Sequence, residues 1–180
     1  MYYKTWGTGI HPPTGRPTPG VDTCGPLSSG MKIWIDADAA PNDVKEIVFR
    51  ASARLELETL LVANQRLSTP AANPLVKSVT VAGGPDVADQ HIIDHAEEGD
   101  LAITADIPLA AALVEKGVFV LDPRGEQYSE ANVRERLSIR DFMDSLRSSG
   151  VQTGGPRPYG RQEKQDFANA LDRLLTRYAG

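Results

Sequence analysis

A short apolar strand that ends in two aspartates constrains this chain more than any other stretch. Residues 32–36 form the expected strand, Asp36 and Asp38 stand at and beyond its end, and Pro41 opens a helix. Side chains alternate along a strand, so the two carboxylates point the same way if the strand persists that far. Adjacent carboxylates repel each other, and a bound cation relieves that repulsion. The stretch indicates either one wall of a divalent-metal site or a solvated turn in which Asp38 caps the helix.

The chain beyond this stretch alternates strands with helices. The first helix runs from Pro41 to about Arg54 and carries an apolar stripe at helical spacing. We expect further strands at 58–63, 78–82, 101–104 and 118–121, and helices at 86–98 and from 106 to about 116. This alternation predicts an α/β fold of three layers, α/β/α, with a mostly parallel sheet. In such sheets ligands bind beyond the carboxyl ends of the strands.

The C-terminal third is predicted to be helical. A short helix starts at Ser129, and a capping-box pattern at 138–141 opens a second helix that ends at Gly150. A loop over residues 151–160 leads to a last amphipathic helix. The apolar residues expected inside are Phe142, Met143 and Leu146 in the second helix and Phe167, Leu171, Leu174 and Tyr178 in the last.

Residues 1–30 differ in composition from the rest of the chain. They are rich in Gly, Pro, Thr and Ser and lack apolar periodicity, so we expect a disordered N-terminal extension. Residues 31–180 would then form a single α/β domain with a helical C-terminal segment. The only cysteine, Cys24, cannot form an internal disulfide, and no apolar run approaches the roughly 20 residues of a membrane span. These features favour a cytoplasmic protein.

Four aspartates fall where an α/β sheet places its ligands. Asp36 and Asp38 follow the first strand, Asp106 follows the strand at 101–104, and Asp89 lies on the buried stripe of the helix that enters that strand. If these two strands are neighbours, the four carboxylates converge. Oxygen-only ligands suit Mg²⁺ or Mn²⁺, which orient a water and stabilise the charge that develops on a phosphodiester.

Each of these acids has a structural alternative. Asp38 and Asp106 could cap the helices that follow them, and Asp89 could complete a capping box with Asp86. Capping does not exclude metal binding, because a carboxylate can cap with one oxygen and bind with the other.

Two arginines are candidate phosphate contacts. Arg124 follows the strand at 118–121, where it could instead pair with an acid, and Arg157 lies in the 151–160 loop, which could equally be a plain linker. His91 and His95 have the i,i+4 spacing of a zinc pair, but no cysteine or third histidine joins them. A surface pair is the better interpretation.

Several motifs together resemble a known family. They are Ile33-Trp-Ile-Asp-Ala-Asp-Ala-Ala-Pro41, Leu61-Val-Ala-Asn64, Val87-Ala-Asp-Gln90, Gly99-Asp-Leu-Ala-Ile-Thr-Ala-Asp-Ile-Pro-Leu-Ala110, Asp122-Pro-Arg-Gly-Glu126, Arg140-Asp-Phe-Met-Asp144 and Gln152-Thr-Gly-Gly-Pro156. The set resembles the bacterial YaiI/YqxD family, which is placed among PIN-like domains. The resemblance implies an acidic pocket like that of PIN ribonucleases, with Asp36, Asp38, Asp89 and Asp106 as its acids. The family usually has cysteine where this chain has Ala40.

Two functions follow as expectations. The first is a Mg²⁺- or Mn²⁺-dependent, nuclease-like hydrolase that acts on RNA, with Asp36 and Asp38 as catalytic residues and all four aspartates around the metal. The second is a PIN-like module that binds nucleic acid or protein without catalysis. The net charge of −5 slightly favours the second, because non-specific nucleic-acid binding depends on basic patches. It does not exclude the first, because metal ions bridge carboxylates to phosphates.

Overall fold

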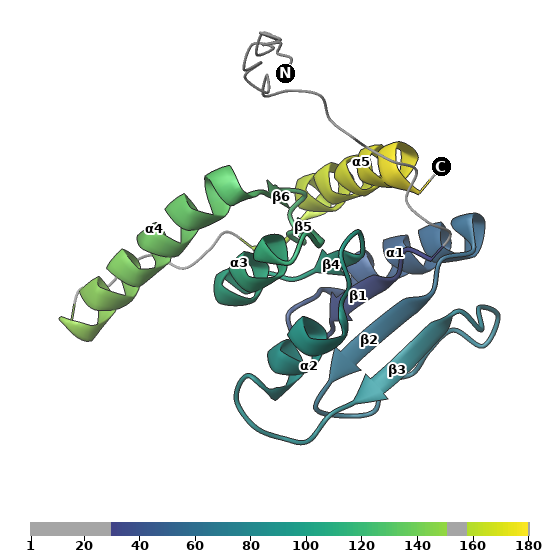
Figure 1. Ribbon diagram of the computed structural model, residues 1–180, viewed down its shortest axis with the longest axis horizontal. Helices are drawn as coiled ribbons and strands as arrows, with labels where there is room; N and C mark the ends of the chain where they lie inside the picture. The colour runs from purple at the N-terminus through teal and green to yellow at the C-terminus, as the bar shows by residue number, and fades with distance from the viewer. Residues whose placement is uncertain (1–29, 151–157, 180) are drawn as a thin grey trace, which may run out of the picture.

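A six-stranded sheet forms the centre of the computed structural model, which describes residues 30–150 and 158–179 (Figure 1). The strands are β1 (Ile33–Asp36), β2 (Thr59–Ala63), β3 (Val76–Thr80), β4 (Leu101–Ile103), β5 (Phe119–Leu121) and β6 (Gln127–Tyr128). Their order across the sheet is β3-β2-β1-β4-β5-β6. All neighbours run parallel except β5 and β6. The predicted α/β fold with a mostly parallel sheet is confirmed.

Helices cover both faces of this sheet and make three layers. Helices α1 (Asn42–Leu55) and α5 (Arg161–Tyr178) lie on one face, and α2 (Val87–His95) and α3 (Ile107–Glu115) lie on the other (Figure 1). The remaining helix, α4 (Glu130–Ser148), packs against α3 at its start and then extends away from the body.

The central strand β1 is apolar on both sides because both of its faces are covered. Ile33 and Ile35 are fully buried and pack with Phe167 of α5 in the cluster beneath α1 and α5. Trp34 points the other way and packs with Ile92 of α2 under the opposite layer. This alternation fixes the register of β1, since a slip by one residue would exchange the two faces.

The order of the strands reverses at β1. The chain passes from β1 outward through β2 to β3 and then returns to β4 on the other side of β1. Ile35 lies opposite Ile103, so Asp36 and Thr104 follow at the same level of the sheet. The expectation that the first strand and the strand at 101–104 are neighbours is therefore confirmed. A reversal of this kind opens a crevice at the carboxyl edge.

The opposite edge of the same two strands is held by a buried carboxylate. Asp100 is 4% exposed and precedes β4 directly. Its oxygens accept hydrogen bonds from the backbone N–H of Lys32 at 2.9 Å, from Trp34 Nε1 at 2.8 Å and from the backbone N–H of Glu97 at 3.0 Å. Three donors thus tie the start of β1 and the loop after α2 to the start of β4.

Gly125 brings the β5–β6 turn against α5. Its φ is +90°, and a Cβ at this position would lie 2.6 Å from the backbone carbonyl carbon of Asp166. Only glycine combines this backbone conformation with so close an approach. The turn therefore docks directly on the α5 backbone.

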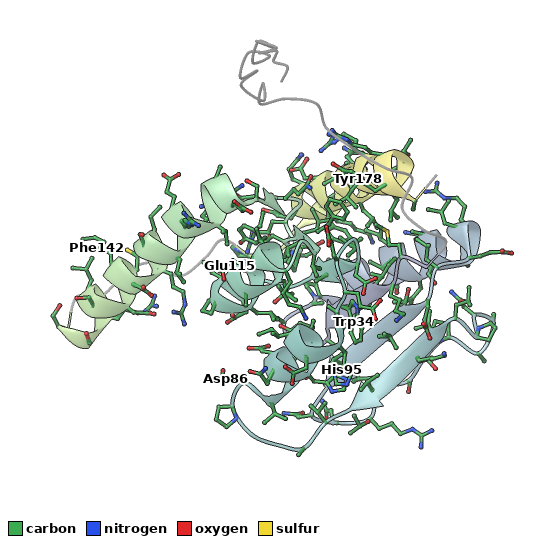
Figure 2. All side chains as sticks on the ribbon, in the orientation of Figure 1. Trp34, Asp86, His95, Glu115, Phe142 and Tyr178 are labelled. Carbon is green, nitrogen blue, oxygen red and sulfur yellow. The ribbon has the colours of Figure 1, made fainter. Side chains whose placement is uncertain are left out.

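The C-terminal helices differ from the prediction at one place. Residues 130–148 form the single helix α4, and the predicted break at Ser138 is wrong. The Ser138 hydroxyl bonds back to the carbonyl of Arg134, which lets a serine sit inside a helix. Phe142 was expected inside but is 63% exposed, on the part of α4 that extends from the body (Figure 2).

Two details of the sheet also differ. The strand expected at 78–82 begins earlier, as β3, and the short antiparallel β6 was not expected at all. Its two residues carry too little pattern to read as a strand. Among the helices of the described ranges, none has both the length and the apolar character needed to cross a membrane.

Candidate functional site

A pocket of about 420 Å³ opens at the carboxyl edge where the strand order reverses. Asp36, Asp38, Asp89 and Asp106, the four predicted site acids, all line it. Asn64, at the end of β2, and Asp86, at the start of α2, complete its polar wall. We refer to this space as the acidic pocket. The structure brings together acids from the end of β1 and the loop after it, from α2 and from the β4–α3 loop, and whether they bind a metal stays a prediction.

Asp36 is the deepest of these acids. It is 6% exposed, and its Oδ2 accepts a hydrogen bond from Thr104 Oγ1 at 3.1 Å. Burial raises the pKa of Asp36 above its ordinary value, and the nearby charge of Asp38 raises it further. Hydrogen bonds from Thr104 and from the backbone of Ala39 and Asp38 oppose that rise. Asp36 is thus a buried carboxylate that a cation would favour in its charged form.

Thr104 is a residue of the site that the sequence analysis missed, as it missed Asn64 and Asp86 in the pocket wall. Its hydroxyl donates to Asp36 and also accepts from the backbone N–H of Asp106 at 3.0 Å. It is 1% exposed. A threonine two residues before an aspartate at a strand end was the available signal, because its hydroxyl reaches the loop backbone.

The charges of neighbouring acids shift the pKa of Asp89. Its pKa is raised to about 6, first by burial and then by the charges of Asp106, Asp36 and Asp86. Carboxylates on α2, β1 and the β4–α3 loop are therefore close enough to repel one another. The predicted position of Asp89 on the inner side of its helix agrees with this half-buried setting.

Asp106 caps α3, as one of the alternatives predicted. Its Oδ1 accepts a hydrogen bond from the backbone N–H of Leu109 at 2.8 Å, and Pro108 fits the first turn of the helix. One oxygen is committed to the helix, so Oδ2 is the oxygen available to the pocket.

The other two capping predictions are wrong. Pro41 occupies the N-cap position of α1, and Asp38 is exposed at the rim of the pocket. Asp86 occupies the N-cap position of α2 but makes no side-chain cap, and Asp89 does not complete a capping box with it. The φ of +59° at Asp86 is the reason, since a capping side chain needs an extended backbone. Neither the Asp38 nor the Asp89 carboxylate caps a helix.

The chemistry of the donors fits a hard divalent cation. None of the four site acids has a lysine or arginine within ion-pair distance among the described residues. In the same ranges, no three acid, histidine or cysteine side chains form a compact ligand group. A closed zinc cage needs such a group, whereas Mg²⁺ keeps several waters and uses one or two carboxylates. The all-oxygen pocket suits an ion of the second kind.

The two candidate phosphate contacts are not part of this pocket as described. Arg124 Nη1 lies 3.5 Å from Glu163 Oε1 at the start of α5. It therefore pairs with an acid, although not with one of the four site acids. Arg157 lies outside the described residues.

The two histidines of α2 form a stacked pair. Their ring centroids are 4.0 Å apart, and His95 Nδ1 donates to the backbone carbonyl of His91 at 2.8 Å. Burial and the neighbouring His95 lower the pKa of His91. Stacked rings do not converge on a metal, so the pair acts as a structural feature of the helix surface.

Comparison with known proteins places this arrangement in a family. Residues 34–177 match the family model described as "Uncharacterized BCR, YaiI/YqxD family". A "UPF0178 protein" of Myxococcus xanthus (strain DK1622) is 59% identical over 147 residues, which cover 82% of this chain and 95% of the relative. The "UPF0178 protein" of Dechloromonas aromatica (strain RCB) is 53% identical over 147 residues, 82% of this chain and 97% of the relative. The match spans β1 to α5 and includes every acid of the acidic pocket, so the chain belongs to the YaiI/YqxD family.

Proposed function

We propose that the protein is a Mg²⁺- or Mn²⁺-dependent phosphodiester hydrolase that acts on RNA at the acidic pocket. The observation that carries the proposal is the convergence of Asp36, Asp89 and Asp106 without a cationic side chain to balance them in the described ranges. A protein stabilises such a group when a cation or a catalytic proton resides there. The resemblance to PIN-like domains points the same way and stays a prediction.

Each residue has a distinct part in this proposal. Asp36, Asp89 and the free oxygen of Asp106 would hold the ion, one or two of them directly and the rest through its bound waters. Thr104 would keep Asp36 and Asp106 in register. Asp38, exposed at the rim, would be a further ligand or would orient the attacking water. A bound Mg²⁺ or Mn²⁺ would lower the pKa of a water and neutralise charge on the phosphodiester.

The test is an Asp36→Asn variant of the full chain. We expect the purified wild-type protein to bind Mn²⁺ with a measurable heat and to cleave single-stranded RNA in its presence. Asp36→Asn should abolish both, because it removes the charge from the deepest acid. The matched control is Asp94→Asn on the exposed side of α2, which should behave as wild type. Cleavage that persists unchanged in Asp36→Asn would belong to a contaminating nuclease.

A second candidate is a module that binds nucleic acid or protein without catalysis. One observation favours it: the described residues contain no compact group of three possible metal ligands. A thermal melt with increasing Mn²⁺ separates the two. A site that binds the ion raises the melting temperature as its occupancy rises. At an ion concentration of one hundred times the Kd, the free energy of unfolding increases by about 2.7 kcal/mol. A flat response would leave the non-catalytic function.

A further inference from the structure

A second hollow is lined by α1 and by residues of β2 and the loop after it. It has a volume of about 350 Å³. Asn42, Lys45 and Phe49 of α1 form one wall, and Leu61, Leu67 and Ser68 form the floor and the opposite wall. We refer to it as the α1 hollow. Its size falls within the range of sites that hold a small organic group.

The two spaces are neighbours along two segments of chain. Asp38 and Ala39 line the acidic pocket, and Asn42 lines the α1 hollow three residues later. Likewise, Asn64 lines the acidic pocket, and Leu67 lines the hollow. A linear ligand that passes over these two loops would therefore contact both spaces.

The side chains of the α1 hollow combine a cation with an aromatic ring. Lys45 and Phe49 are separated by four residues on α1, so they lie on the same face of the helix. Both are half-buried. Within the described ranges, the Lys45 ammonium has no carboxylate at ion-pair distance, although Glu46 also borders the hollow. A half-buried lysine without a carboxylate at ion-pair distance can receive an anion.

The hollow is also built on fixed parts of the molecule. Leu61 is 1% exposed and belongs to the sheet. The backbone N–H of Leu67 donates to Ser78 Oγ at 3.2 Å, which ties its loop to β3. The apolar floor and the position of Lys45 therefore do not depend on a ligand.

We propose that the α1 hollow binds a nucleotide next to the phosphodiester held in the acidic pocket of an RNA strand, with the base against Phe49 and Leu67 and its phosphate at Lys45. This inference rests on the proposed function and adds the substrate contact that the acidic pocket lacks. A positive group that tracks the backbone, together with an aromatic side chain that stacks a base, is the usual basis of single-strand binding. Carboxylates alone repel a phosphate, so a cation beside them is needed to hold the strand.

The test measures binding of a short fluorescent single-stranded RNA in EDTA, so that neither metal binding nor cleavage enters. Lys45→Gln should weaken binding and reduce the slope of log affinity against log salt by about 0.7, the value for one lost phosphate contact on a single strand. Arg50→Gln is the matched control, because it removes one exposed charge from the same helix outside the hollow. It should bind RNA as wild type does.

Two further variants test the base contact. Phe49→Leu keeps an apolar side chain but removes the ring, and should weaken binding about fivefold or more. Because Phe49 also contacts the core, Ser68→Trp is added: Ser68 is exposed, so this variant fills the hollow without disturbing the interior. Variants are compared at equal folded fraction, from their melting curves.

The outcomes separate this inference from the proposed function. Weakened binding in Lys45→Gln, Phe49→Leu and Ser68→Trp, with Arg50→Gln unchanged, supports the hollow even if Mn²⁺ produces no cleavage. Equal losses in Lys45→Gln and Arg50→Gln would show a non-specific charge effect and overturn it. Failure of both the wild-type protein and an Asp36→Asn/Asp89→Asn variant, whose acidic pocket repels a phosphate less, to bind the RNA in EDTA would overturn it as well.

Discussion

Thr104 donates a hydrogen bond to Asp36 across the junction of β1 and β4, over a distance of 3.1 Å. The same hydroxyl accepts from the backbone of Asp106, and the side chain is buried. One hydroxyl therefore links two acids that come from different elements, the end of β1 and the start of α3. This hydroxyl is thus a hydrogen-bond link between the β1 side and the α3 side of the acidic pocket.

Replacing Thr104 by valine should weaken the site without changing its shape. The variant loses the hydrogen bond that lowers the pKa of Asp36, so that pKa should rise further, and it leaves the N–H of Asp106 unpaired. Loss of such a supporting contact typically costs a factor of about 10 to 100 in metal affinity. Calorimetric titration with Mn²⁺ measures the change. Thr104→Ser keeps the hydroxyl and should retain most of the affinity, and an equal loss in both variants would assign the effect to packing of the methyl group.

The raised pKa of Asp89 predicts an unusual pH dependence of stability. The pKa of Asp89 is about 6 in the folded protein, against an ordinary pKa of 3.8. Between these values the folded protein binds more protons than the unfolded chain, so the contribution of Asp89 to stability falls as the pH rises from about 4 to about 6. Urea unfolding in EDTA at a series of pH values measures the effect. In Asp89→Asn the free energy of unfolding should fall less steeply over this pH range, because the titrating carboxyl group is gone. Added Mn²⁺ at pH 7 should restore the stability, because it favours the charged form. Identical slopes in the two proteins would contradict this assignment.

Gly125 should be far less tolerant of a side chain than another glycine of similar conformation. Gly125→Ala combines a positive φ with a Cβ 2.6 Å from the α5 backbone, so we expect a loss of about 3 kcal/mol or more. Gly150 has a φ of +87° with nothing within 4 Å, so Gly150→Ala should cost only about 1–2 kcal/mol of conformational strain. Urea denaturation of the two variants makes the comparison. Equal losses would mean that the β5–β6 turn is not docked on α5.

Asp100 should be essential to the fold rather than to activity. In Asp100→Asn, one carboxylate oxygen becomes an NH₂ group, which faces at least one of the three N–H donors and cannot accept from it. The free energy of unfolding should fall by about 2–4 kcal/mol. Because Trp34 Nε1 is one of the donors, tryptophan fluorescence reports the change together with the melting curve. The exposed Asp166→Asn serves as the control and should shift stability by less than about 0.5 kcal/mol.

The sequence predicted the sheet because its signals are local and strong. The buried strands at β1, β2, β4 and β5 are nearly continuous apolar runs, and the helices between them have clear stripes. The alternation alone did not predict that β1 and β4 are neighbours. The convergence of the acids was expected only if they were. Pairing across a sheet depends on contacts distant in sequence, and the structure supplies it.

The parts that could not be predicted have specific physical causes. Ser138 begins a capping-box pattern, but its hydroxyl can also bond back within a continuous helix, and the sequence does not decide between the two. The left-handed conformation of Asp86 was not predicted, because aspartate adopts it more often than most residues but still uncommonly, and the sequence does not mark where. Thr104 was missed because its contact with Asp36 spans 68 positions of the chain. Such contacts become visible only after the strands are paired.

The two ends of the β1–β4 pair have different roles. At one end Asp100 accepts three hydrogen bonds and holds the strands together, and at the other the charges of the pocket acids repel one another. Substitutions at the acidic end remove repulsion and leave the cohesive end intact. A library that randomises Asp36, Asp89 and Asp106 while it retains Asp100 and Trp34 would therefore sample new chemistry on an undamaged sheet.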